Sequence, residues 1–325
     1  MRFLWKAADA LAEATVVLSY GSPGYRLRTH LWNADALSVD LTNKVMVVTG
    51  ANSGLGKAAA TQLAGLGATV VMVCRDRSRG EAAQREIRDR HARAILELEI
   101  ADLSDMDTLR ELARRLIERH PAIDVLINNA GVMLHERKLS ADGIEMTFAT
   151  NVLGGFVLTH ALLPQLERAA APRIVHVTSG GMYTQRIDVQ DLQFEHKEYD
   201  GVVAYAQSKR AQVVLSELWA ERLATRGITS NCMHPGWAAT PGVERSLPRF
   251  YRWLRPLLRD HQQGADTAVW LAAGSEAEGV TGRLFFDRQP RRTHIFRRTR
   301  HTPQEAQRLW EICELLGGIN NGDAS

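Results

Sequence analysis

Three cysteines in 325 residues, none of them in a CxxC pair, are too few and too scattered for a disulfide framework or a structural zinc site. No uninterrupted apolar run approaches the roughly 18 residues that a membrane-spanning helix needs. The chain has 40 Lys and Arg against 37 Asp and Glu, and a net charge of +3 does not indicate a nucleic-acid-binding protein. What remains is a globular protein of a reducing compartment, and we expect it to be cytoplasmic.

Short runs rich in β-branched residues alternate with longer helical patterns between residues 44 and 286. The expected strands are 45–48, 69–73, 95–98, 125–127, 174–177, 228–233 and 284–286. Helical patterns between them are typical of βαβ units on a parallel sheet. The alternation predicts an α/β fold in which residues 41–290 form a single doubly wound (Rossmann) domain around a seven-stranded parallel sheet.

Two terminal segments fall outside this alternation. Residues 1–40 are predicted to form an N-terminal helical extension that packs on the domain, with contact to a membrane surface as the alternative. Residues 291–325 are predicted to form a basic C-terminal segment and a helix, opened by Thr302-Pro303 and ended by Gly317-Gly318. The Arg-rich stretch 283–300 is predicted to be a solvated loop, although anionic lipid or nucleic acid could also bind it.

A glycine-rich turn follows the first expected strand and precedes a helix. Its residues are Gly50, Asn52, Ser53, Gly54, Leu55 and Gly56. Glycines allow a tight turn and close backbone approach, and the first N–H groups of the helix can bind a pyrophosphate. An ordinary glycine turn is the alternative, but the strand-to-helix context favours a dinucleotide site.

Tyr205 and Lys209 are four residues apart on an expected helix, so their side chains share a face. A phenol has a pKa near 10, and a neighbouring ammonium group favours the phenolate and lowers that pKa. Tyr205 is therefore a candidate general acid or base. Ser179, just past a buried strand, is a candidate to hold a substrate oxygen. A surface contact between Tyr205 and Lys209, and a turn role for Ser179, are the alternatives.

The order of these motifs resembles that of the short-chain dehydrogenase/reductase family. The motifs are Gly50-x-x-x-Gly54-x-Gly56, Asn128-Asn129-Ala130-Gly131, Asn151, Ser179, Tyr205-Ala206-Gln207-Ser208-Lys209 and Pro235-Gly236. The resemblance covers about residues 45–286, and longer strings such as His234-Pro235-Gly236-Trp237 resemble a branch near the retinol-dehydrogenase-like enzymes. It implies an oxidoreductase that moves a hydride between a nicotinamide cofactor and a carbonyl or alcohol carbon.

The resemblance also implies roles for individual residues. The catalytic set is Asn151, Ser179, Tyr205 and Lys209, in which Asn151 bends its helix and holds a water that links Lys209 to solvent. A satisfied core amide is the alternative for Asn151. Lys209 would bond the nicotinamide ribose. The cofactor would also contact Gly50, Asn52, Ser53, Gly54, Leu55, Gly56, Arg75, Asp102, Leu103, Asn129, Ala130, Gly131, Pro235, Gly236 and Thr240. No metal site is expected.

The end of the second strand bears on the choice between NADP and NAD. Enzymes that prefer NAD usually place an acidic residue there, which bonds the ribose 2′-hydroxyl. Here the position falls on Cys74, and Arg75 follows as a forked cationic donor for a 2′-phosphate. Asp76 is nearby and weakens the argument. The sequence favours NADP and leaves NAD open.

Two regions bear on the substrate. Ser179 and Tyr205 are separated by an extra segment around 184–201, which we expect at the substrate mouth. Residues 237–260 are predicted to form a substrate lid. Its apolar and aromatic stripe consists of Leu247, Phe250, Tyr251, Trp253, Leu254, Leu257 and Leu258. The stripe either packs in the core or lines a pocket for a lipophilic carbonyl or alcohol substrate.

Two other functions are compatible with parts of the sequence. A nucleotide-sugar epimerase or dehydratase would need a Gly-x-x-Gly-x-x-Gly turn and a larger C-terminal domain, and both are missing. A nicotinamide-binding regulatory or scaffold protein with little turnover would not require Ser179, Tyr205 and Lys209 together. The resemblance further implies a homodimer or homotetramer that pairs through 145–168 and 203–223, which the terminal segments could block or modify.

Overall fold

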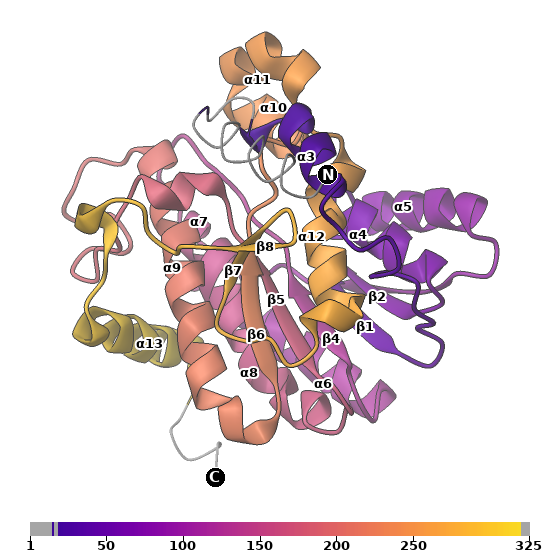
Figure 1. Cartoon of the computed structure of the whole chain (residues 1–325). Coiled ribbons are helices and arrows are strands. Elements are labelled where there is room, and N and C mark those ends of the chain that lie inside the picture. Colours follow the sequence, from indigo (N-terminus) through magenta and orange to yellow (C-terminus); the bar gives the residue numbers. More distant parts are fainter. Residues whose placement is uncertain (1–14, 16–18, 320–325) are drawn as a thin grey trace.

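The computed structural model describes residue 15 and residues 19–319 of the chain (Figure 1). One sheet has the strand order β3-β2-β1-β4-β5-β6-β7-β8. Its strands are β1 (Val45–Thr49), β2 (Thr69–Cys74), β3 (Ile95–Ile100), β4 (Val125–Asn128), β5 (Arg173–Val177), β6 (Thr229–Met233), β7 (Leu284–Phe286) and β8 (Gln289–Arg291). The pairings from β3 through β7 are parallel, and β8 runs antiparallel to β7.

Helices cover both faces of this sheet (Figure 1). They are α3 (Ser22–Thr29), α4 (Gly54–Gly65), α5 (Arg77–Arg90), α6 (Met106–Arg119), α7 (Met146–Phe148), α8 (Gly154–Leu166), α9 (Gly201–Arg222), α10 (Pro241–Ser246), α11 (Pro248–Leu254), α12 (His261–Ala273) and α13 (Pro303–Gly317). Val47 of β1 packs into a core with α6, α8 and α9, whereas its neighbours Met46 and Val48 pack into a second core with α4 and α12. Alternate residues of a strand point to opposite faces, and this places the sheet between two helical layers.

The predicted α/β fold is confirmed, and each of the seven expected strands is present, but the prediction of a seven-stranded, all-parallel sheet is wrong. An eighth strand, β8, pairs antiparallel with β7 through Phe286 and Gln289. This strand was missed because it is three residues long and contains Pro290, whose lack of an N–H group confines it to an edge strand.

The turn between β7 and β8 corrects a second expectation, that of a fully solvated Arg-rich loop. Arg288 lies in this turn, and its guanidinium group donates to both carboxylate oxygens of Asp266 at 2.7 and 2.8 Å. It also lies 4.1 Å from the ring centroid of Trp32, and its side chain is only 10% exposed. Arg288 is therefore part of the protein interior, whereas Arg297, Arg298 and Arg300 are exposed as predicted.

The C-terminal helix α13 begins and ends where the sequence predicts. Thr302 and Glu305 form a reciprocal capping box at its start, and Gly318 ends it with a left-handed φ of 64°. The ring of Trp310 lies 4.5 Å from that of Trp219 on α9 and 4.8 Å from that of Phe156 on α8. Helix α13 thus covers part of the surface of α8 and α9.

Among the described residues, one helical stretch, Met146–Leu166, is long and apolar enough to cross a membrane by length and composition. Most of it is buried inside the fold, as Phe156, Leu158 and Leu162 illustrate. Burial of this kind is typical of the core helix of a doubly wound domain. The N-terminal helical extension expected in residues 1–40 includes α3, whereas residues 1–14 and 16–18 of it lie outside the described residues.

Candidate functional site

The glycine-rich turn follows β1 and leads into α4, as the sequence predicts. Gly50 and Gly54 have positive φ values of 67° and 55°, a backbone conformation that residues other than glycine rarely adopt. A Cβ atom on Gly56 would lie 2.4 Å from the carbonyl oxygen of Gly50 and 2.5 Å from Nδ2 of Asn129. The turn is therefore closed against its own backbone, and it presents the N-terminus of α4 at the carboxyl edge of the sheet.

Asn129 and Ala130 join the end of β4 to this turn. The side-chain amide of Asn129 donates to the carbonyl oxygen of Thr49 at 2.8 Å. In return, the hydroxyl oxygen of Thr49 accepts the backbone N–H groups of Asn129 and Ala130, both at 3.0 Å. The predicted cofactor residues around 50–56 and 129–131 are thus held side by side at the carboxyl ends of two adjacent parallel strands.

Ser179, Tyr205 and Lys209 meet at the carboxyl end of β5. The phenol of Tyr205 is hydrogen-bonded to Ser179, which also accepts the backbone N–H of Gly181 at 3.3 Å. Lys209 lies one turn further along α9, and its Nζ is 5.6 Å from the ring centroid of Tyr205. The structure therefore brings together the three residues that the sequence selected for proton transfer and orientation of a substrate oxygen.

Lys209 is buried, and its ammonium group donates to the carbonyl oxygen of Val177 at 3.0 Å and to Oε1 of Gln212 at 2.9 Å. Burial lowers the pKa of Lys209 to about 7, because the charged form loses its water. Lys209 can thus gain or lose a proton near neutral pH. Gln212 was not selected from the sequence, although its position three residues after Lys209 places it on the same helix face.

The pKa of Tyr205 differs from the sequence-based expectation. Lys209 was expected to lower the pKa of Tyr205. Instead, loss of water around the phenol raises this pKa above its ordinary value, and the hydrogen bond with Ser179 opposes the rise only in part. The ammonium charge of Lys209 is directed at Val177 and Gln212 instead. In the protein alone, Tyr205 is therefore a protonated phenol at neutral pH.

Asn151 lies in a π-helical turn, Ala149–Leu153, that interrupts the helical run from α7 into α8. Its side-chain oxygen accepts the N–H of Val132 at 2.7 Å, and its amide group donates to the carbonyl oxygen of Val132 and to Oγ of Ser208, both at 2.9 Å. A Cβ atom on Gly131 would lie 3.3 Å from both Oδ1 of Asn151 and Nζ of Lys209. The widened turn, a feature frequent at functional sites, places Asn151 beside the lysine.

The end of β2 carries Arg75, with a side chain that is 69% exposed. Its guanidinium group is 3.7 Å from Asp102, and the other carboxylate oxygen of Asp102 accepts from the backbone and side chain of Ser104. Asp76 caps α5 by accepting the N–H of Arg79 at 2.9 Å. Asp76 is therefore occupied with its own helix, and Arg75 extends from the sheet edge.

The remaining predicted cofactor residues lie along the same edge. Gly236 has a φ of 71°, and the Pro235 carbonyl oxygen accepts from Arg259 at 3.3 Å. Thr240 caps α10 through its hydroxyl group. Leu103 is buried against Gly154, where a Cβ atom would lie 2.2 Å from the Leu103 carbonyl oxygen. The glycine at 154 thus lets α8 approach the loop that carries Asp102 and Leu103.

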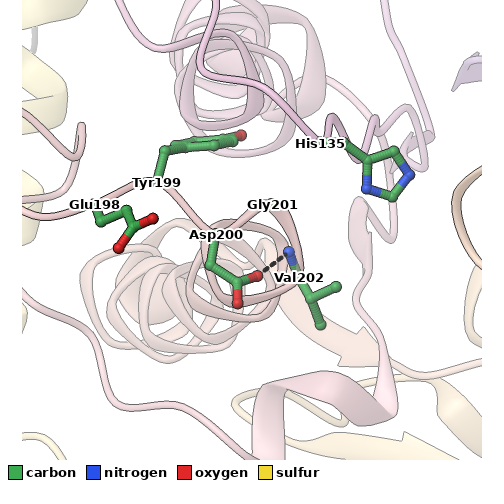
Figure 2. A pocket seen from close by; sticks show the side chains of 6 residues that line it. All are labelled: His135, Glu198, Tyr199, Asp200, Gly201 and Val202. Atoms are coloured by element: carbon green, nitrogen blue, oxygen red, sulfur yellow. Dashed lines mark hydrogen bonds between the residues drawn. The ribbon is translucent and has the colours of Figure 1, made fainter.

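The extra segment around 184–201 folds back on the loop before α7. The hydroxyl group of Tyr199 donates to Glu145 at 3.1 Å, and Arg137 donates to the carbonyl oxygen of Gln193 at 2.9 Å. The end of the segment lines a polar surface pocket of about 430 Å³ with His135 (Figure 2). Figure 2 shows Asp200 capping the first turn of α9 through the N–H of Val202, one turn before Tyr205.

The predicted lid consists of α10, α11 and the turn that follows. Phe250 packs against Trp237 with ring centroids 5.1 Å apart, and Leu258 is buried, so this side of the stripe packs inward. Trp253 is 81% exposed and does not belong to that packed side. The stripe therefore divides into an inner apolar side and an outer side.

Comparison with known proteins agrees with these motifs. Residues 44–249 match the family model described as short chain dehydrogenase. The chain is 44% identical to dehydrogenase/reductase SDR family member 12 of Bos taurus over 299 residues, which are 91% of this chain and 93% of that protein. It is 38% identical to retinol dehydrogenase 12 of Homo sapiens over 283 residues, 86% of this chain and 88% of that protein.

Solved structures show the same fold. An uncharacterised protein from Mycobacterium paratuberculosis superposes with a TM-score of 0.71 at 31% identity, covering 88% of this chain and 97% of that one. The Pseudomonas aeruginosa RhlG/NADP active-site complex superposes with a TM-score of 0.62 at 25% identity, covering 75% of this chain and 94% of that one. The family model, the relatives and the fold agree: the chain belongs to the short-chain dehydrogenase/reductase family of oxidoreductases.

Proposed function

We propose that the protein is an NADP(H)-dependent oxidoreductase that interconverts the carbonyl and alcohol forms of a lipophilic substrate. The observation that carries the proposal is the hydrogen bond between Tyr205 and Ser179, with Lys209 on the same helix face, beside the glycine turn. A phenol and a hydroxyl group that converge on one point can bind one oxygen atom, as a carbonyl or alcohol substrate requires.

The glycine turn supports binding of a nicotinamide dinucleotide. A side chain at Gly50 would crowd Ala130, and one at Gly56 would clash with the Gly50 carbonyl group and Asn129. The two glycines therefore let the turn close tightly at the start of α4, where free backbone N–H groups can bind a pyrophosphate. Asn52, Ser53, Leu55, Asn129, Gly131, Pro235, Gly236 and Thr240 would complete the site. The cofactor, when bound, supplies or accepts the hydride.

The residues of the chain supply the proton and orient the substrate. Ser179 would hold the substrate oxygen, and Tyr205 would donate its phenolic proton to that oxygen during reduction or remove it during oxidation. The raised pKa of Tyr205 favours the proton-donating role at neutral pH. Lys209, with a pKa of about 7, would return a proton to the phenol, and Asn151 beside it would hold the water that links Lys209 to solvent.

We propose NADP rather than NAD because of the end of β2. Cys74 is neutral and buried there, and Arg75 is the exposed cation that could bind a 2′-phosphate. Asp76, the carboxylate that argued against this choice, accepts from the N–H of Arg79 at the start of α5.

The lipophilic substrate is proposed from the inner side of the lid, where Phe250 and Trp237 pack together near the Pro235-Gly236 turn. The similarity to retinol dehydrogenase 12 supports it, since the name of that protein describes an apolar alcohol. We also propose a cytoplasmic location, because Cys74, Cys232 and Cys313 are free and buried. Peripheral membrane contact stays a proposal, and none of the residues that the structure describes supports it.

Pairing into a homodimer or homotetramer also stays a proposal. Trp310 of α13 lies against Phe156 and Trp219, so a pair formed through α8 and α9 would have to include α13. Light scattering on the full chain measures the mass. The alternative of a regulator with little turnover is not favoured by any of these contacts.

The test combines cofactor binding with turnover. We expect NADPH to bind, followed by the fluorescence of the reduced nicotinamide, and bulky apolar aldehydes to be reduced in preference to small hydrophilic ones. Tyr205→Phe should lower kcat by about 10²- to 10⁴-fold, because the proton donor is lost, with NADPH affinity nearly unchanged. Unchanged turnover in Tyr205→Phe would refute the assignment.

A further inference from the structure

Tyr20 comes from the N-terminal segment, far in sequence from the motifs, yet it contacts both loops of the candidate site. A Cβ atom on Gly180, the residue after Ser179, would lie 2.7 Å from Cε1 of Tyr20. The carbonyl oxygen of Tyr20 accepts the N–H of Trp237 at 2.8 Å. The segment therefore lies between the end of β5, which holds Ser179, and the end of β6, which carries Pro235-Gly236.

The ring of Tyr20 belongs to a group of aromatic side chains. Its centroid is 5.1 Å from those of His234 and Phe286 and 5.8 Å from that of Trp237. Trp237 in turn contacts Phe250 of the lid. Tyr20 is partly exposed.

Three buried charges anchor the segment. Arg28 of α3 donates to Asp287 at 2.8 Å, and Arg259 donates to both carboxylate oxygens of Asp287. The same two arginines hold the N-terminal main chain: Arg28 donates to the carbonyl oxygen of Ser19 at 2.9 Å, and Arg259 donates to that of Tyr20 at the same distance. Arg28, Arg259 and Asp287 are each at most 1% exposed.

The anchor also fixes a strained turn. Asp287 and Arg288 form the two-residue turn between β7 and β8, with φ values of 50° and 58°. Positive φ at both central positions of a hairpin favours Asn, Asp and Gly, so Arg288 is the unusual residue of this turn. Both residues have their side chains in buried ion pairs, Asp287 with Arg28 and Arg259, and Arg288 with Asp266.

Burying three charges costs desolvation free energy that an apolar contact would avoid, so such a cluster is better explained by positioning than by stability. What the cluster positions is the backbone from Ser19 to Gly21. In Figure 1, α3 lies at the same end of the sheet as α10 and α11 of the lid.

We propose that Tyr20 is a specificity-determining residue whose ring forms a wall of the substrate site between Ser179 and Trp237. Arg28, Asp287 and Arg259 are the positioning residues that hold it there. The inference rests on the proposed function and extends it. A bulky apolar substrate whose oxygen is bound at Ser179 and Tyr205 contacts this wall, whereas a very small one does not reach it.

The test compares two aldehydes in the full-length protein with NADPH, propanal as the small substrate and 2-naphthaldehyde as the bulky one. In Tyr20→Ala we expect KM for 2-naphthaldehyde to rise about tenfold, since an apolar contact is lost. KM for propanal and the Kd of NADPH should stay within twofold. Tyr20→Phe, which keeps the ring, should restore the affinity for 2-naphthaldehyde.

Two further variants test the anchor. Arg28→Met should raise KM for 2-naphthaldehyde in the same selective way, because the Ser19 carbonyl oxygen loses the shorter of its two arginine hydrogen bonds and keeps only the one from Arg259. Arg26→Ala, at an exposed position of the same helix, is the matched control and should behave as the wild-type protein does. Circular dichroism establishes that each variant is folded, and Tyr20→Leu replaces Tyr20→Ala if the latter does not fold.

The outcomes separate this inference from the proposed function. If the wild-type protein reduces the aldehydes but Tyr20→Ala loses activity equally for both, or loses NADPH affinity in parallel, the role of Tyr20 is structural and the inference is overturned. If the folded wild-type protein reduces neither aldehyde, the proposed function fails, and the inference that depends on it fails too.

Discussion

The two halves of the candidate site are built in different ways. The cofactor half uses the turn after β1, the start of α4 and the end of β4, which are held by backbone approach and by Thr49 and Asn129. The proposed substrate half combines segments around Tyr20, Ser179, Trp237 and Asp287. Buried charged groups join the segments of Tyr20 and Asp287. The first is compact in sequence and depends on glycine, whereas the second is assembled across the whole chain and depends on ion pairs.

This difference predicts how each half fails when it is changed. A turn that packs tightly against its own backbone has no room for an added atom, so even a single added methyl group should disrupt it. A buried ion cluster tolerates the loss of a partner poorly, because an uncompensated charge remains inside the protein.

The largest effect on stability is expected from the substrate half. Asp287→Asn would leave Arg28 and Arg259 buried without their anion, and we expect a loss of about 3–5 kcal/mol in urea unfolding. Glu86→Gln is the control: it breaks the more exposed pair with Lys57 and should cost at most about 1 kcal/mol. Equal effects of the two changes would remove the distinction between the halves.

The same cluster predicts an acid dependence. Burial opposes ionisation of Asp287, but Arg259 and Arg28 outweigh it and hold the pKa of Asp287 below its ordinary value. The stabilisation is therefore present above the unfolded-state pKa, near 4, and is lost as the pH falls through the folded-state pKa. The stability difference between wild-type protein and Asp287→Asn should shrink in that acid range.

In the cofactor half, Gly56→Ala should cost about 1–3 kcal/mol and weaken NADPH binding, because the new methyl group meets the backbone of Gly50. Gly227→Ala is the matched control. It has a φ of 68°, and a Cβ atom there would meet no described atom within 4 Å, so only strain of about 1 kcal/mol is expected. NADPH titration of Gly227→Ala should give the wild-type Kd.

Lys209 lies at the boundary of the two halves. Its burial predicts that it lowers the stability of the folded protein in a pH-dependent way, although the proposed activity requires it. In the folded protein its pKa is about 7, below the ordinary 10.5, so the cost of holding the charge is full below pH 7 and disappears between pH 7 and about 10.5. Lys209→Met should therefore be inactive, and its stability relative to wild type should be more favourable at pH 6 than at pH 9. Thermal unfolding at the two pH values measures this, and an advantage that grows with pH would contradict it.

The smallest effect is expected at the sheet edge. Arg75→Ala should raise the Kd of NADPH about tenfold, the loss of one charge-assisted contact, and leave the Kd of NADH within twofold. Stability should not change, because Arg75 is 69% exposed and its approach to Asp102 is long. Parallel titrations with the two cofactors measure the effect, and an equal loss for both would refute the binding of the 2′-phosphate by Arg75.

Local sequence patterns predicted the features that depend on residues close together in the chain, namely the strands, the last helix and the glycine turn. The β-branched runs located β1 to β7, the Thr302-Pro303 signal located α13, and the glycine spacing located the turn after β1. The spacing of Tyr205 and Lys209 placed them on one helix face, because four residues make about one helical turn. The strand β8 escaped detection because Pro290 is a signal against a strand unless the strand lies at an edge.

What only the tertiary structure decided concerns groups that are distant in sequence. The direction of the Tyr205 pKa depends on burial and on Ser179, and the buried state of Arg28, Arg259 and Arg288 depends on Asp287 and Asp266. A sequence pattern reports whether a residue is charged, but not whether a carboxylate some 30 or 260 positions away will neutralise it. Coulombic contacts and desolvation act through space, and the position of Tyr20 follows from them rather than from any local motif.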